Sequence, residues 1–126
     1  MIEYTIDEAQ RLIRVRMSGA NTPNDLLRHV SDLSANPRFD ATFNTLFYIA
    51  EDARLQTTLF DSLLKTVLEQ WQQRRKGVKW AIVSSSKIQL ALAKLVTDNI
   101  KFQFVQLRFF DDEDGALKWL SSGTPA

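Results

Sequence analysis

Apolar residues stand at every second position in two segments near the start of the chain: Ile2, Tyr4 and Ile6, and then Ile13, Val15 and Met17. Arg14 and Arg16 alternate with the second set. A period of two is typical of strands with one exposed face, so the pattern predicts two strands. Because residues 7–11 contain no glycine, we expect a loop of several residues between the strands, which pair antiparallel.

A helix is predicted from Pro23 onward. Thr22 is a preferred N-cap residue, Pro23 suits the first helical position, and Asp25 can complete a capping box. Apolar residues then recur at helical spacing until Asn36, after which Pro37 cannot continue the helix. Residues 43–50 form an almost unbroken apolar run, which predicts a central strand covered on both faces.

The clearest helical periodicity in the chain is a stripe formed by Leu59, Phe60, Leu63, Leu64, Val67, Leu68 and Trp71. It predicts a long amphipathic helix that packs on a sheet. Residues 74–76, two arginines and a lysine, place positive charge at the negative end of the helix dipole. Gly77 can supply the left-handed residue that terminates the helix.

The last third of the chain continues this alternation. Residues 78–83 predict a buried strand, and a serine run leads into a helix whose apolar side we expect to face inward: Ile88, Ala91, Leu92, Leu95 and Val96. Residues 104–109 predict an edge strand with one face exposed to solvent. Acidic residues at 111–114 then begin a final helix that docks through Ala116, Leu117, Trp119 and Leu120.

Strands and helices therefore follow one another in the order ββαβαβαβα. This order predicts an α/β fold with a single mixed, mostly parallel five-stranded sheet, right-handed crossovers and helices on the faces of the sheet. No repeat, linker or low-complexity stretch divides the chain, so residues 1–126 are expected to form a single domain.

Composition narrows the function classes. The formal charge is +1, which gives no strong field for nucleic acid, and no apolar stretch is long enough to span a bilayer. The absence of cysteine excludes disulfides and thiolate chemistry, and one histidine, His29, is too few for a typical zinc centre. We expect a cytoplasmic protein, not an integral membrane protein, with no metal and no cofactor.

The strand at 78–83, Val-Lys-Trp-Ala-Ile-Val, and the closing run at 109–120, Phe-Phe-Asp-Asp-Glu-Asp-Gly-Ala-Leu-Lys-Trp-Leu, carry a family resemblance. Together with the element order, they make nearly the whole chain resemble the SpoIIAA-like family, which has a STAS-type fold. The resemblance implies a non-enzymatic regulatory or protein-interaction module with a protein partner. It also implies likeness to lipid-carrying CRAL-TRIO folds, so a carrier or sensor of a small apolar or amphipathic ligand is the alternative.

The family name refers to anti-sigma-factor antagonists, whose phosphoacceptor lies in an Asp-Ser-x-Gly segment after the third strand. The corresponding segment here, residues 49–58, contains neither serine nor glycine. This departure argues against a phosphorylation switch. Modification of Thr57 or Thr58 stays an open question.

Candidate site residues come from the loops that follow the strands, because ligands of open α/β sheets bind beyond the carboxyl ends of strands. We expect a ligand- or partner-binding rim that contains Glu51, Asp52, Arg54, Thr57, Ser84, Ser85, Ser86 and Asp111. The three serines precede a helix N-terminus, where an anion can bind, although helix capping is the simpler role.

Two kinds of chemistry, metal binding and nucleophilic catalysis, compete here with simpler structural roles. Glu51 and Asp52, with Asp111 and Asp112, could hold magnesium, but no spaced ligand loop accompanies them. A serine nucleophile needs a nearby base, and His29 belongs to the first helix, where a boundary position is expected. We therefore assign no catalytic residue and no metal ligand, and an enzyme that uses the serine rim is the weakest reading.

Aromatic side chains are abundant for a small domain: Phe47, Tyr48, Phe60, Trp71, Trp80 and Phe104. Imperfect packing among such bulky groups can leave a pocket between the second helix and the sheet, which is where the alternative function would place its ligand. An exposed sheet edge also offers a surface for a homodimer.

Overall fold

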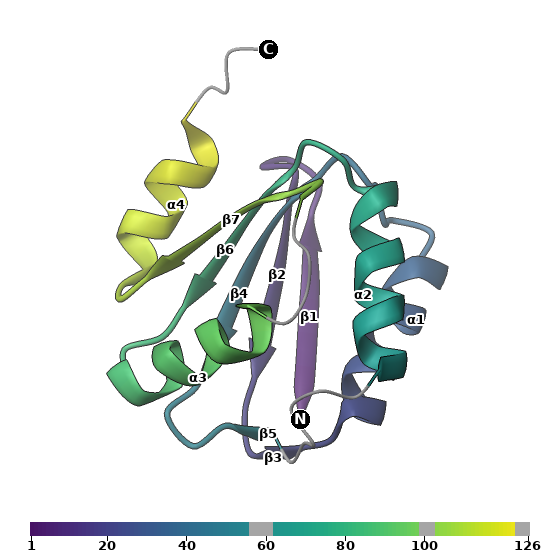
Figure 1. Cartoon of the computed structure of the whole chain (residues 1–126). Helices are drawn as coiled ribbons and strands as arrows, with labels where there is room; N and C mark the ends of the chain where they lie inside the picture. Colours follow the sequence, from purple (N-terminus) through teal and green to yellow (C-terminus); the bar gives the residue numbers. More distant parts are fainter. Residues whose placement is uncertain (56–61, 99–102, 123–126) are drawn as a thin grey trace.

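The computed structural model describes residues 1–55, 62–98 and 103–122, and its centre is a five-stranded sheet in the order β1-β2-β4-β6-β7 (Figure 1). The strands are β1 (Ile2–Asp7), β2 (Leu12–Met17), β4 (Asn44–Ile49), β6 (Lys79–Val83) and β7 (Gln106–Phe110). β1 runs antiparallel to β2, and the other neighbours pair parallel. The prediction of an α/β chain with a mixed five-stranded sheet is confirmed.

Two short strands outside this sheet were not predicted. β3 (Ala20–Asn21) and β5 (Arg54–Leu55) pair parallel to each other and tie the loop after β2 to the loop after β4. The side chain of Asn21 is buried and secures this corner, donating to the carbonyl oxygens of Ser18 and Gly19 at 3.1 and 3.0 Å. Strands of two residues are too short to show a period in the sequence.

Four helices lie within the described residues: α1 (Pro23–Ala35), α2 (Ser62–Arg74), α3 (Lys87–Asp98) and α4 (Glu113–Ser121). The capping box of α1 is confirmed, because Thr22 Oγ1 accepts from the Asp25 N–H and Asp25 Oδ2 accepts from the Thr22 N–H. Gly77 has the predicted left-handed conformation, with φ of 88°. The predicted start of the second helical stripe, Leu59 and Phe60, lies outside the described residues.

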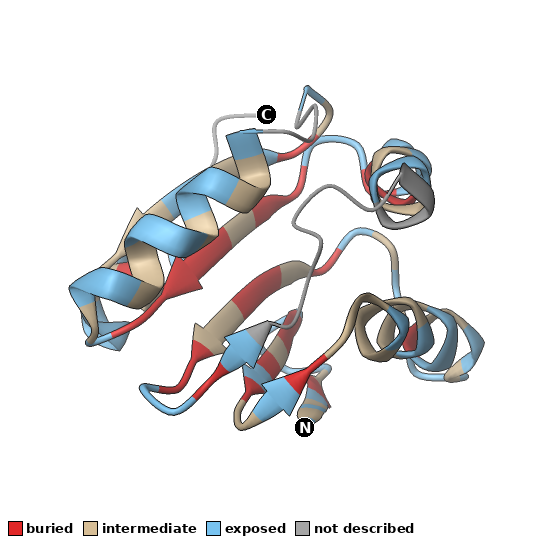
Figure 2. Ribbon diagram, turned by 60° about the horizontal axis from the view of Figure 1, so that its bottom comes forward, coloured by how far each residue is buried: buried red, intermediate tan, exposed pale blue. Residues whose placement is uncertain are grey.

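The helices form two layers around the sheet. In Figure 1, α1 and α2 lie on one side of the sheet and α4 on the other. Leu12, Leu46, Ala81 and Val83 form the core beneath α4 together with Ala116 and Leu120. The alternate residues face α1 and α2, where the core contains Ile6, Ile13, Val15, Leu33, Phe43 and Trp71. Figure 2 shows that buried residues are concentrated in the strands.

The predicted inward face of α3 is wrong for Ile88, Ala91, Leu92 and Leu95 and right for Val96. Ile88, Leu92 and Leu95 are 73%, 45% and 53% exposed, Ala91 is exposed as well, and no residue of α3 is buried. Apolar residues occur around most of this helix, so its period did not decide which face turns inward. The helix turns Val96, as predicted, and Ala93, which was not predicted, toward the sheet.

The closing strand also differs from its predicted bounds. Residues 104–109 were expected in the strand, whereas β7 begins at Gln106, whose N–H donates to the Val78 carbonyl oxygen at 2.9 Å, and ends at Phe110. Its position at the edge of the sheet, beside β6, is as predicted.

Candidate functional site

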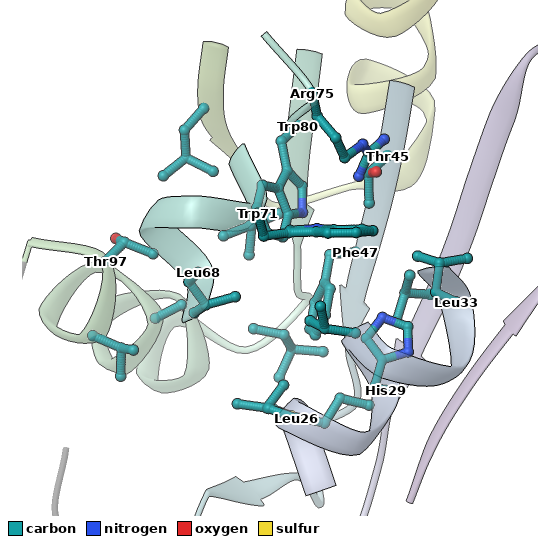
Figure 3. Close-up of a pocket in the computed structure, with 18 residues that line it drawn as sticks. Leu26, His29, Leu33, Thr45, Phe47, Leu68, Trp71, Arg75, Trp80 and Thr97 are labelled. Carbon is teal, nitrogen blue, oxygen red and sulfur yellow. The ribbon is translucent and has the colours of Figure 1, made fainter. Parts of the chain in front are cut away.

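A cavity of about 120 Å³ lies between the sheet and the helices α1, α2 and α3 (Figure 3). Its walls are mostly apolar side chains, including Val15, Phe47 and Ile82 from the sheet, Leu33 from α1, Leu68 and Trp71 from α2, and Ala93 and Val96 from α3. The sequence prediction of a pocket between the second helix and the sheet agrees in part with this position, and α1 and α3 also contribute to the walls.

The local sequence explains why space remains here. On β4 and β6 the inward positions carry large side chains such as Phe47 and Ile82, while α3 opposes them with the small residues Ala93, Val96 and Thr97. A cavity of this volume lowers stability by about 3 kcal/mol at about 24 cal/mol per Å³. A molecule that fills the cavity recovers part of that free energy.

Two fully buried polar side chains interrupt the apolar wall. Thr45 is 2% exposed and Arg75 is 3% exposed, and neither Thr45 Oγ1 nor Arg75 Nε has a hydrogen-bond partner among the described residues. Figure 3 shows both side chains at the same end of the cavity, beyond the ring of Trp71. This end of the cavity is therefore polar and cationic.

Three neighbours, a carbonyl oxygen and two aromatic rings, hold the guanidinium of Arg75 in place. Its Nη2 donates to the carbonyl oxygen of Phe43, and its central carbon lies 5.8 Å from the ring centroids of both Phe39 and Trp71. Burial lowers the pKa of Arg75 to about 10, because desolvation disfavours the charged form. The group still carries its charge at neutral pH.

His29 lines the cavity from α1. Burial lowers its pKa to about 4, with a further lowering by the charge of Arg75 and an opposing effect of Asp32. Its ring meets the ring of Tyr4 edge-on, with centroids 5.6 Å apart. The imidazole is neutral at pH 7, and its half-buried position agrees with the predicted boundary position.

The structure brings part of the predicted rim together. Glu51, Asp52 and Arg54 line a second, more open hollow, which Gln89 and Leu92 of α3 complete. Gln89 Nε2 donates to the carbonyl oxygens of Glu51 and Ala53 at 3.0 and 2.6 Å, so α3 is anchored to the loop after β4. The rim stays a predicted binding surface.

The three serines have separate structural positions. Ser84 is buried and donates to the Ile49 carbonyl oxygen at 2.8 Å, whereas Ser85 is exposed and donates to Glu51 Oε1 at 3.1 Å. Ser86 Oγ accepts from the Gln89 N–H at 3.3 Å, which is the capping role that the sequence predicts. An anion site at these serines is still a hypothesis.

The remaining rim residues are scattered. Asp111 is exposed, and its neighbour Asp112 caps α4 by accepting from the Gly115 N–H at 2.6 Å. Thr57 and Thr58 lie outside the described residues. In residues 1–55, 62–98 and 103–122, no three acidic or histidine side chains gather as a metal site would require, so Glu51 and Asp52 do not form one with Asp111 and Asp112.

Sequence reasoning missed the polar end of the cavity, although signals for it were present. Arg75 follows Trp71 by four residues, so it continues the apolar stripe of α2 and shares its inward face. Thr45 stands two residues before Phe47 in a buried strand, and therefore points to the same side of the sheet. A polar residue on an apolar stripe was the available clue.

The described part of the chain contains no helix long and apolar enough to cross a membrane. We also compared the chain with protein-family models, with curated proteins and with solved structures. None of these comparisons produced a match.

Proposed function

We propose that the chain binds a small apolar molecule in the cavity between the sheet and α1, α2 and α3, and acts as a carrier or sensor of that molecule. The observation that carries this proposal is the cavity itself, which has a volume of about 120 Å³ and mostly apolar walls. Apolar cavities of comparable volume, about 150 Å³, stay dry and take up molecules the size of benzene.

The expected affinity follows from the energetic cost of the empty cavity. Filling it recovers up to about 3 kcal/mol of lost contacts, and a binding free energy of about 3 kcal/mol corresponds to a Kd of about 6 mM. A six-carbon probe such as 1-hexanol therefore binds in the millimolar range. A natural ligand that makes further contacts binds more tightly.

The position of Ala93 allows a direct test. Ala93 lines the cavity, whereas Ala91 lies on the same helix and is exposed. Ala93→Phe places a ring in the cavity, and Ala91→Phe places the same ring in solvent. Native mass spectrometry of gently purified protein and thermal shift with 1-hexanol then compare the wild type with both variants.

The proposal predicts that the wild type and Ala91→Phe respond alike. Both retain a bound small molecule or gain thermal stability with 1-hexanol, and Ala93→Phe does neither. Equal responses of Ala93→Phe and Ala91→Phe would contradict a site in this cavity. Failure of the wild type to bind any probe would contradict the function.

Protein interaction is a second candidate function, and α3 favours it. Ile88, Leu92 and Leu95 stand at positions i, i+4 and i+7 and are exposed, so they form an apolar row on the outside of the molecule. Such a row fits the groove or helix of a partner protein. The resemblance to STAS-type regulatory domains supports the same function, as a non-enzymatic module in the cytoplasm.

The second candidate is tested by substitution within that row. The double change Ile88→Gln and Leu92→Gln removes two members of the row, while Ala91→Gln changes the same helix without removing a large apolar group. If a protein partner binds the wild type and Ala91→Gln reproducibly but does not bind the double variant, the result supports the interaction. Retention of that partner by the double variant rules out the row as the interface.

A further inference from the structure

The strongest unexplained feature of the cavity is a buried cation without an anionic partner. Arg75 is 3% exposed, and no described carboxylate forms an ion pair with it. A guanidinium has five N–H donors, and the Nη2 bond to Phe43 uses one of them. Burial of an unpaired charge costs several kcal/mol, so this arrangement is one that an anion stabilises.

The aromatic neighbours compensate only part of that charge. Phe39 and Trp71 lie within cation–π distance of Arg75, each at 5.8 Å. Neither ring provides a hydrogen-bond acceptor for Nε. The Nε donor remains buried without a partner on the wall of the cavity.

A second donor is found at the same end. Arg75 binds the carbonyl oxygen of Phe43, and Thr45 lies two residues further along the chain, at the start of β4. Thr45 is 2% exposed, and its hydroxyl oxygen also lacks a partner among the described residues. Figure 3 shows the guanidinium and the hydroxyl together at this end, with the apolar wall beyond them.

We propose that the ligand of this cavity is an apolar carboxylate, whose carboxylate accepts hydrogen bonds from Arg75 and Thr45 while its hydrocarbon part lies against Phe47 and Ile82. This inference rests on the proposed function and specifies its ligand class. A carboxylate has one charge and two oxygens, which match the cation and the two buried donors without a partner, Arg75 Nε and the Thr45 hydroxyl. A phosphate brings more oxygens and more charge than these donors satisfy in an apolar cavity.

The test compares two probes that differ only in the head group, hexanoate and 1-hexanol, in NMR titrations at pH 7. Hexanoate is expected to bind at least about tenfold more tightly than 1-hexanol, which corresponds to about 1.4 kcal/mol. Arg75→Met retains a long side chain without charge and is expected to lower the ratio of the hexanoate affinity to the 1-hexanol affinity to about one. Arg74→Met is the matched control, because Arg74 is the exposed neighbour, and it keeps the ratio.

Thr45→Val provides an independent variant, since it removes the hydroxyl and keeps the shape of the side chain. It is expected to lower the ratio of the two affinities about threefold to tenfold. It decides the question if Arg75→Met fails to fold. Equal binding of hexanoate and 1-hexanol by the wild type overturns the inference that the ligand is a carboxylate. The proposed binding of apolar molecules in the cavity then stands. Binding of neither probe overturns both proposals.

Discussion

Arg75, which follows the last residue of α2, donates a hydrogen bond from Nη2 to the backbone carbonyl oxygen of Phe43, which precedes β4. The contact joins the end of the helix to the start of the central strand. It also fixes a buried cation on the wall of the cavity. The same side chain thus links the packing of α2 to the chemistry of the candidate site.

The stability effect of Arg75 depends on what replaces it. Replacement of a buried charge by an apolar group of similar length is often neutral or stabilising. We expect Arg75→Met to change the free energy of unfolding by less than about 1 kcal/mol in the absence of ligand. Arg75→Ala, which also leaves a hole beside Trp71, is expected to cost about 3 kcal/mol. Urea denaturation measures both, and equal costs would show that the charge itself stabilises the fold.

His29 gives the stability a defined pH dependence. Its folded pKa is about 4, against 6.5 for an unperturbed histidine, chiefly through burial, with Arg75 lowering it and Asp32 opposing. Between about pH 6.5 and pH 4 the unfolded chain therefore binds a proton that the folded chain does not. The contribution of His29 to the free energy of unfolding is fully present above about pH 6.5. It falls by about 3 kcal/mol as the pH drops to about 4.

The contribution of His29 is isolated by comparison with His29→Leu, which does not titrate. The difference in unfolding free energy between the wild type and the variant should shift by about 3 kcal/mol between pH 7 and pH 4. Denaturant titrations at several pH values provide this difference. A constant difference across the range would show that His29 is not buried in its neutral form.

Ser84 is expected to act as a structural residue. Its buried hydroxyl donates to the Ile49 carbonyl oxygen and accepts from the Ser86 N–H at 3.2 Å. Ser84→Ala leaves both groups without this partner and is expected to lower the free energy of unfolding by about 2 kcal/mol. Ser85→Ala, at the exposed neighbour, is expected to cost less than about 0.5 kcal/mol. Chemical denaturation should separate the two, and similar losses would refute this assignment.

Lys79 holds the last helix to the sheet. Its Nζ is buried and donates to the Trp119 carbonyl oxygen and to the carbonyl and hydroxyl oxygens of Ser122, each at 2.9 Å. Lys79→Met removes all three bonds and is expected to cost about 2 kcal/mol. The exposed Lys76 provides the control, with a cost below about 0.5 kcal/mol for Lys76→Met. Thermal unfolding of both variants checks this prediction. If Lys79→Met does not lower stability, Lys79 does not hold the last helix to the sheet.

The framework of the fold was predictable because it depends on local patterns. The capping box at Thr22 and Asp25 and the left-handed Gly77 are set by a few adjacent residues, and the structure contains both. The alternation in β1 and β2 likewise fixes which side chains face the core. Each of these features follows from short-range sterics and hydrogen bonding.

The candidate site was not predictable in the same way, because it depends on how side chains from distant elements meet. The sequence placed Ile88, Leu92 and Leu95 in the core, whereas α3 exposes them and turns Ala93 inward. The volume of the cavity therefore depends on how all the side chains on this face of the sheet pack against the helices. The burial of Arg75 also depends on Phe43, which is far away in the sequence.

A methyl NMR titration of the wild-type chain with 1-hexanol tests directly whether the cavity binds apolar molecules. If the cavity binds apolar molecules, the methyl signals of Val15, Ile82 and Ala93, which line it, shift and saturate together. The signal of Ile88, which is exposed on α3, should stay in place. Shifts confined to Ile88, or no saturable shift at the three cavity residues, would show that the cavity does not bind apolar molecules.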